Sequence, residues 1–204
     1  MKFRLIRWTL IGTLAAMASA CAPLMVGGMV GGAMVASDRR TSGIQLEDEN
    51  IELKAASRIR EMMGSRAHLN ITSYNRQVLI TGEVPNAQDR DYVQRLVSEV
   101  ENVRKVVNET VIGQNSSLTE RSTDALITAK VKGQMVDSKD IFANAYKIVT
   151  ERGVVYLMGR VTQREADRAT EVARQVSGVK KVVRIFEILT EAELNALLPA
   201  PPKN

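Results

Sequence analysis

Few of the residue types on which catalytic and metal sites depend occur in this chain. Its 204 residues include one cysteine (Cys21) and one histidine (His68), and only 4% are aromatic. A single cysteine excludes a disulfide framework and a cysteine-ligated zinc cluster. A single histidine removes most histidine–metal and nucleophile–base designs. We therefore expect a protein that binds or organises, with no enzymatic activity, no catalytic residue, no metal and no cofactor.

The first twenty residues follow the pattern of a secretory signal peptide. Three basic residues precede a short apolar core, Trp8 to Met17, and the small residues 18–20 precede Cys21. A cysteine directly after small residues resembles the bacterial lipobox, which implies cleavage before Cys21 and attachment of lipid to its thiol. Without residues 1–20 the chain carries 25 basic and 23 acidic residues, so the mature charge is only +2.

Two alternatives remain for this region. The 29 residues from Trp8 to Ala36 carry no charge, which is long enough to span a bilayer of about 30 Å as an uncleaved anchor. Several glycines and Pro23 make the second half of this stretch a poor helix former. A soluble exported form is the other alternative. We favour the lipoprotein, with residues 21–44 as the lipidated cysteine and a flexible tether.

The rest of the chain contains an internal repeat. Asn70 to Gly82 aligns with Lys147 to Gly159 at an offset of 77, and Val103 to Val107 aligns with Val179 to Val183 at an offset of 76. One single-residue insertion explains both offsets. The repeat predicts two copies of one domain at 45–113 and 121–190, a linker at 114–120, and a disordered tail at 191–204.

Each copy shows the same order of hydrophobic periods. In the first copy they predict a helix from Ile51 to about Arg66, strands Leu69–Tyr74 and Gln77–Val84, a helix Asn86–Glu101 and a strand Val103–Ile112. In the second they predict a helix Ser122–Val136, strands Tyr146–Glu151 and Val154–Val161, a helix Gln163–Ser177 and a strand Val179–Leu189. The fold class is therefore α+β, with two tandem αββαβ domains, each of two helices packed on a three-stranded sheet.

Gly82 and Gly159 occupy the same place, just before a strand ends. A glycine there predicts a bulge, or a helix that approaches so closely that a Cβ atom would clash. Neither copy has the glycine spacing of a phosphate-binding loop.

The repeated segments resemble the BON (bacterial OsmY and nodulation) domain. The segments are Val78–Val84 with Val103–Val107, and Val154–Val161 with Ser177–Val183. Together with the signal and Cys21, the chain resembles the outer-membrane lipoproteins of Gram-negative bacteria that carry two BON domains. The resemblance implies a palmitate-bearing anchor on the periplasmic face of the outer membrane, phospholipid binding, and support of outer-membrane integrity, including at division sites.

The two copies differ in charge. Residues 45–113 hold 9 basic and 11 acidic residues, whereas residues 119–190 hold 13 basic and 9 acidic ones. Anionic head groups attract each nearby Lys or Arg by roughly 1 kcal/mol. We therefore expect the second copy to bind an anionic phospholipid surface and the first to act as a spacer or a scaffold for a partner protein.

The first helix of the second copy is the candidate contact. Ile127, Val131 and Met135 should face the sheet, and Leu126 falls about 100° away from them. In the lipoproteins that the chain resembles, lipid binds at this helix, often beside an aromatic residue where this chain has Leu126. The candidate residues are Ser122, Thr123, Ala125, Leu126, Ala129, Lys130, Lys132 and Gly133. A single exposed leucine is also common on ordinary surfaces.

Other polar and apolar residues have simpler interpretations. His68 is expected to be a surface or satisfied histidine, and the acid pairs Asp89/Asp91 and Glu99/Glu101 to lie on solvated helix faces. Ile141-Phe142 is a second apolar contact candidate, with Phe142 as a cap on the core as the alternative. A mature charge of +2 argues against nucleic-acid binding. The rival function is a monomeric periplasmic scaffold that binds an envelope protein during envelope assembly or stress.

Overall fold

The computed structural model describes residues 38–197, and the predicted signal, Cys21 and most of the predicted tether lie outside them. Both repeats belong to one compact unit that begins at Ala36. The first contains α3 (Ser42–Met63), η2 (Gly64–Arg66), β1 (His68–Tyr74), β2 (Gln77–Val84), α4 (Ala87–Ser98), β3 (Lys105–Asn108) and β4 (Val111–Ile112). The second contains α5 (Leu118–Asp137), η3 (Ala143–Ala145), β5 (Tyr146–Glu151), β6 (Val154–Thr162), α6 (Gln163–Arg174) and β7 (Lys181–Leu189), followed by α7 (Glu191–Leu197). The predicted α+β fold with two αββαβ repeats is confirmed.

Each sheet is mixed. In the first repeat β2 pairs antiparallel with β1 and parallel with β3 and β4. In the second repeat β6 pairs antiparallel with β5 and parallel with β7. The last strand predicted for the first repeat is interrupted between Asn108 and Val111. The side-chain oxygen of Asn108 accepts hydrogen bonds from the backbone N–H and the hydroxyl of Thr110 there. The second repeat keeps this strand continuous over nine residues.

Three domain boundaries differ from the prediction. Helix α3 begins at Ser42, inside the predicted tether, because the Thr41 hydroxyl caps it. Helix α5 begins at Leu118, inside the predicted linker, because Ser117 and Glu120 form a reciprocal capping box. The predicted disordered tail contains α7, whose Leu194 is buried.

The hairpin turns are the tight polar turns that the sequence predicts. Asn75 and Arg76 both have positive φ, and so do Arg152 and Gly153. Two consecutive residues of this conformation form the turn whose twist matches that of the flanking strands.

Gly82 and Gly159 are required by a close backbone approach. A Cβ atom at Gly82, which has a φ of 109°, would collide with the carbonyl oxygen of His68. At Gly159 it would lie 2.7 Å from the carbonyl oxygen of Ala145. The neighbouring segment at Gly82 is therefore the start of β1, and at Gly159 it is the end of the short 3-10 helix η3, immediately before β5.

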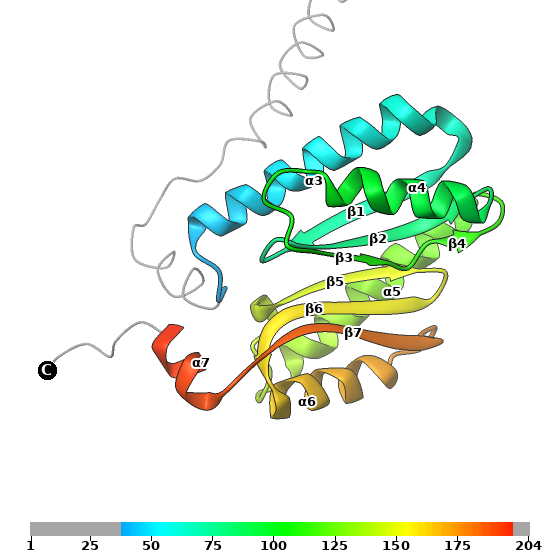
Figure 1. Ribbon diagram of the computed structural model, residues 1–204. Helices are drawn as coiled ribbons and strands as arrows, with labels where there is room; N and C mark the ends of the chain where they lie inside the picture. The colour runs from blue at the N-terminus through cyan, green and yellow to red at the C-terminus, as the bar shows by residue number, and fades with distance from the viewer. Residues whose placement is uncertain (1–37, 198–204) are drawn as a thin grey trace, which may run out of the picture. The chain divides into compact units, whose positions relative to one another are not determined.

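Each repeat covers one face of its sheet with its two helices and turns the other face toward the other repeat (Figure 1). Residues of both sheets form a third apolar cluster: Tyr74, Leu79, Tyr156, Met158 and Ile185. We call this contact the seam. Because of it, the inner face of each sheet is covered, whereas the outward helices of each repeat stay exposed.

Candidate functional site

Helix α5 has the core face that its sequence predicts. Ile127, Val131 and Met135 are buried against the sheet of the second repeat. Their spacing of four residues places them along one side of the helix. Asp124 is buried beside them and Thr128 is half-buried, whereas the opposite side of α5 is left to solvent.

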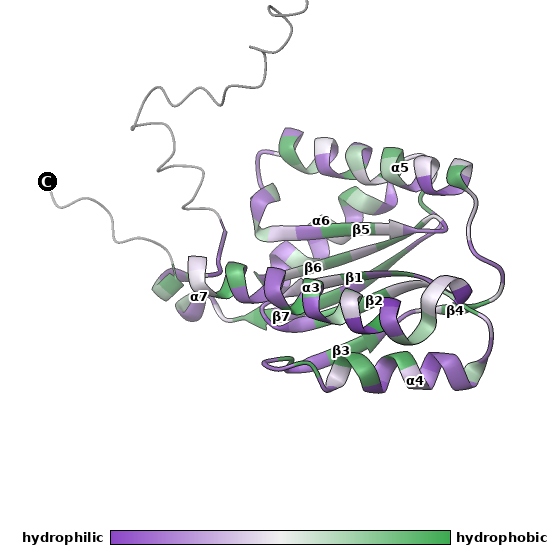
Figure 2. Ribbon diagram, turned by 90° about the horizontal axis from the view of Figure 1, so that it is seen from above, coloured by the Kyte–Doolittle hydropathy of each residue, from purple (hydrophilic) through white to green (hydrophobic). Residues whose placement is uncertain are grey.

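All eight predicted contact residues on α5 are exposed. Leu126 is 63% exposed, and Leu118 and Val136, which the sequence interpretation did not include, are more exposed still. Small residues at positions 125, 129 and 133 share this side of the helix with the larger apolar side chains. Polar and apolar residues alternate along α5 (Figure 2). We call these exposed residues of α5 the outward stripe.

The outward stripe carries positive charge without exposed negative charge over most of its length. Between Ser122 and Val136 the one carboxylate is Asp124, and it is buried. Within residues 38–197, neither Lys130 nor Lys132 pairs with a carboxylate. Lys130 follows Leu126 by one helical turn and shares its side. Lys132 is six positions from Leu126 and therefore lies on the other flank of the stripe.

The equivalent helix of the first repeat has a different outward face. Leu46 and Leu53 are exposed on α3, so apolar exposure alone does not distinguish the two helices. Glu49 is exposed between these leucines, where α5 has Ala125. The other exposed charges of α3 are mixed: Lys54, Arg58, Arg60 and Glu61. The difference between the two helices is therefore local: Glu49 would repel anionic head groups beside Leu46 and Leu53, whereas no exposed carboxylate lies between Ser122 and Val136 of α5.

A hollow of about 370 Å³ lies beside the first half of α5, with Thr123, Ile127, Arg152 and Lys180 in its lining. Gly178, which has no side chain, also borders it. In the first repeat the residues equivalent to Thr123 and Gly178 are Glu47 and Asn102, whose side chains hydrogen-bond to each other at 2.9 Å. These two side chains therefore occupy, in the first repeat, the place that corresponds to the hollow beside α5.

The two adjacent apolar residues of the loop after α5 differ in exposure. Ile141 is buried in the core of the second repeat, whereas Phe142 is 63% exposed. The alternative of Phe142 as a core cap is therefore wrong, and this aromatic ring remains available for contact. Lys139 and Asp140 of the same loop are also exposed.

A buried aspartate on the first helix of each repeat holds the hairpin turn of that repeat. Asp124 accepts hydrogen bonds from the backbone N–H groups of Arg152 and Gly153 at 2.7 and 2.8 Å. Asp48 does the same for Asn75 and Arg76. The sequence interpretation missed both aspartates, although they align at the offset of 76.

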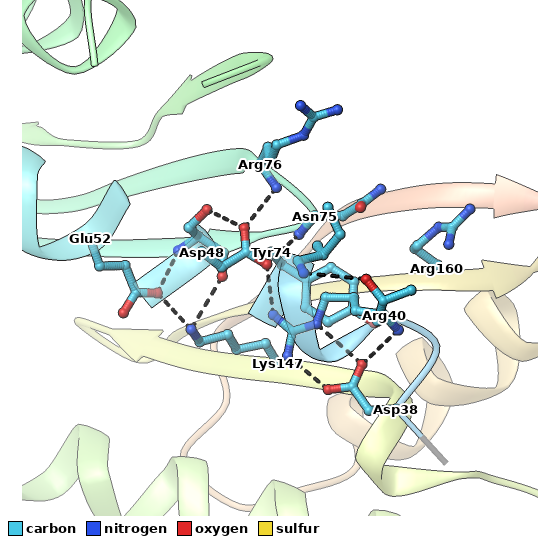
Figure 3. A network of polar contacts seen from close by, with 12 residues as sticks. Asp38, Arg40, Asp48, Glu52, Tyr74, Asn75, Arg76, Lys147 and Arg160 are labelled. Carbon is cyan, nitrogen blue, oxygen red and sulfur yellow. Dashed lines mark hydrogen bonds and ion pairs between the residues drawn. The ribbon is translucent and has the colours of Figure 1, made fainter. Parts of the chain in front are cut away.

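Asp48 is also the centre of a larger polar network (Figure 3). Besides the turn, it accepts hydrogen bonds from the Ser73 hydroxyl at 2.7 Å and from the Arg40 guanidinium at 2.8 Å. Beside it, Glu52 of α3 accepts a hydrogen bond from Lys147 of β5 at 2.6 Å. The network therefore connects the segment before α3, the first repeat and the second repeat.

The remaining titratable residues have structural surroundings. His68 is half-buried at the start of β1, and burial together with the charge of Arg121 lowers its pKa. Asp89 is buried and hydrogen-bonds with the capping residue Asn86 at the start of α4, so its predicted solvation is wrong. Glu101 is exposed and pairs with Lys54.

Residues 38–197 contain neither a metal-binding cluster nor a membrane-spanning helix. No cluster of three or more His, Cys, Asp or Glu side chains in that range could hold a metal ion. No helix in the same range combines the length and the apolar character needed to cross a membrane.

The chain is similar to proteins of known family. Residues 47–114 and 123–189 each match the BON domain. The outer membrane lipoprotein DolP of Haemophilus influenzae is 36% identical over 171 residues, which cover 83% of this chain and 89% of that protein. The 21 kDa hemolysin of Actinobacillus pleuropneumoniae is 31% identical over 151 residues, 73% of this chain and 78% of that protein.

Among solved structures, CdsD, a structural protein of the type III secretion system of Chlamydia trachomatis, covers 75% of this chain. All of that chain is covered, at 12% identity and a TM-score of 0.29, which is too low to support an argument about fold or function. The family is instead established by the two matched domains and the identity to DolP. This chain belongs to the BON-domain family, as a dual-BON protein of the DolP type.

Proposed function

We propose that this protein is a lipoprotein of the outer membrane, anchored through Cys21 on the periplasmic face, whose second BON domain binds anionic phospholipid. Its role is to support outer-membrane integrity, including at division sites. The outward stripe of α5 is the contact surface. The similarity to a lipoprotein of the outer membrane supports the location, and the absence of an exposed carboxylate between Ser122 and Val136 of α5 supports the ligand.

One observation carries this proposal: Leu126 and Lys130 are exposed together on a helix that buries its other side. A leucine that enters the acyl boundary contributes hydrocarbon burial, and a neighbouring ammonium group meets lipid phosphates. Each lysine contributes roughly 1 kcal/mol at an anionic surface. These terms give weak binding, which suits a domain already held near the bilayer by an anchor.

Sedimentation with lipid vesicles tests the contact. A chain that starts at residue 22 retains the compact unit and lacks the lipid anchor. We expect it to bind vesicles that contain anionic phospholipid, to bind purely zwitterionic vesicles much less, and to be released by salt. Leu126→Asp should abolish most of the binding.

The first BON domain provides a matched control. Leu53 is as exposed on α3 as Leu126 is on α5, so Leu53→Asp should leave binding intact. An equal loss of vesicle binding in Leu126→Asp and Leu53→Asp would show that an exposed leucine in either domain contributes to binding, and would contradict the assignment to α5. Absence of binding to every vesicle composition would favour the protein scaffold.

Membrane fractionation of the full chain tests the anchor separately. We expect Cys21→Ala to move the protein from the membrane pellet to the soluble fraction, because no thiol remains for lipid. Retention in the pellet would instead favour an uncleaved apolar anchor.

A scaffold function is the second candidate. The observation that favours it is β7, an edge strand of nine residues whose outer edge has no strand partner within residues 38–197. An extended peptide can add to such an edge through backbone hydrogen bonds.

A further inference from the structure

The segment immediately before α3 makes contacts with both BON domains. Arg39 reaches the second domain, where its guanidinium binds the two carboxylate oxygens of Glu165 at 2.6 and 2.8 Å. It also donates to the carbonyl oxygen of Arg160 at 2.7 Å. The side chains of Arg39 and Glu165 are 4% and 8% exposed, so this bidentate pair is almost fully withdrawn from water.

The next residue reaches the first domain. The guanidinium of Arg40 binds Asp48 of α3 at 2.8 Å and lies 4.2 Å from the centre of the Tyr74 ring (Figure 3). Asp38 holds the other side of the same guanidinium. Two consecutive arginines therefore bind different domains: Arg39 binds the second and Arg40 binds the first. The backbone at these two residues is held by both domains.

The linker between the domains makes a corresponding contact at the other domain. The backbone N–H of Ser116 donates to Glu83 at 3.0 Å, and Glu83 is equivalent in the repeat to Arg160, which Arg39 binds. Ser116 is equivalent in the repeat to Arg40, the residue next to Arg39. The segment before each first helix thus crosses to the end of the middle strand of the other domain, as in a two-fold symmetric dimer.

We propose that residues 38–41 form an interdomain strap that holds the second BON domain against the first and roots the membrane tether in both. The contact between the domains does not depend on lipid binding, whereas its effect on the tether rests on the proposed anchor at Cys21. It leaves 16 residues, 22–37, between Cys21 and the fixed segment, where the sequence predicted a longer free tether. The anchor would therefore act directly on the domain that carries the outward stripe.

The chemistry of the pair makes the strap sensitive to substitution. An arginine fork and a carboxylate match in a bidentate geometry that lysine cannot reproduce. Removal of one partner leaves the other charge buried and unpaired, which is much more costly than the loss of an exposed pair. Glu165 also caps α6 through Thr162, so a test at this position must preserve the cap.

A distance measurement between the domains tests the strap. The chain that starts at residue 22 contains no cysteine, so Gln94→Cys on α4 and Glu171→Cys on α6 would carry two spin labels at exposed sites. We expect one narrow distance distribution by double electron–electron resonance. Arg39→Ala with Arg40→Ala should at least double its width while circular dichroism still shows folded domains.

A second variant covers the case in which the double variant unfolds. Glu165→Gln keeps an acceptor for the capping box but removes the charge that Arg39 binds, and it should broaden the distribution and lower the melting temperature by several degrees. Lys54→Ala, which removes an exposed pair inside one domain, is the control and should change neither. An unchanged distribution in Glu165→Gln, or in a folded double variant, would overturn the strap.

Discussion

The two BON domains have the same interior and different exteriors. Both use a buried aspartate on the first helix to hold the hairpin turn, and both need a glycine where the middle strand passes a neighbouring carbonyl. Their outward helices share exposed leucines and an aligned lysine, Lys54 and Lys130, but α3 exposes Glu49 where α5 has Ala125. Folding constrains the first set of positions, whereas the outward positions carry no packing constraint and can differ between the domains.

The largest difference between the domains should come from their aspartates. Asp48 binds a hydroxyl and Arg40 in addition to its two turn amides, whereas Asp124 binds the turn amides. We expect Asp48→Ala to lower the free energy of unfolding by about 4 kcal/mol and Asp124→Ala by about 2 kcal/mol. Chemical denaturation measures both, and a larger loss in Asp124→Ala would contradict the ranking.

Substitution of the two close-approach glycines, Gly82 and Gly159, should also destabilise the first domain more than the second, by a smaller margin. Gly82→Ala combines a backbone collision with a φ of 109°, which an alanine rarely adopts, whereas Gly159 meets the carbonyl of Ala145 without a positive φ. We expect losses of about 3 and 1–2 kcal/mol respectively. Thermal unfolding of the two variants checks the order, with Gly133→Ala on the surface of α5 as a control that should not destabilise.

Charge reversal on the outward helices should affect binding and not folding. Lys130→Glu removes an attraction of about 1 kcal/mol to an anionic vesicle and adds a similar repulsion, which amounts to a tenfold or larger loss of affinity. Lys54→Glu on α3 should change vesicle affinity little. The structure places the Lys130 side chain in water. A fall of several degrees in the melting temperature of Lys130→Glu, together with the loss of affinity, would contradict that placement.

The smallest expected effect is a pH dependence of opposite sign at two glutamates of the second domain. Burial opposes ionisation of Glu165, but Arg39 and the Thr162 amide outweigh it and lower its pKa, so its stabilisation is present above the unfolded pKa of about 4.3 and is lost as the pH falls. Burial raises the pKa of Glu151 despite a hydrogen bond from Asn70, so its ionisation costs stability as the pH rises.

Melting temperatures of two glutamine variants measure this contrast. At pH 7, Glu165→Gln should melt below the unsubstituted chain and Glu151→Gln above it. Both differences should shrink as the pH is lowered toward 3, because the carboxyl groups become neutral. The same change of melting temperature with pH in both variants would show that the pKa values of Glu165 and Glu151 are not shifted in opposite directions.

Much of the fold followed from local pattern. The hairpin turn at Arg152-Gly153, the core positions of α5 and the exposure of Leu126 could be read from periodicity, because each depends on residues within about ten positions. The repeat strengthened these predictions, since each element was visible twice. The interrupted strand at Asn108 and the early start of α5 at Leu118 were missed because side chains of Asn108 and Ser117 bond nearby backbone there.

The outward stripe was only partly predicted. Leu118 and Val136 extend it, but their exposure depends on where the helix begins and ends and on which side the sheet covers. Lys132 was grouped with Leu126 from composition, and the helix places it on another flank. The exposure of Phe142 could not be decided, because the adjacent Ile141 enters the core in its place.

Amino-acid order alone determined that the chain contains two copies of an αββαβ domain, because hydrophobic period and turn residues act over short distances. The secretory signal before them stays a prediction. Only the tertiary structure decided that the two sheets meet at a seam and that Arg39 is buried against Glu165. Those residues are 126 positions apart, and an arginine before a helix looks the same in sequence whether it is solvated or paired. Their pairing depends on the docking of two complete domains, for which no local pattern exists.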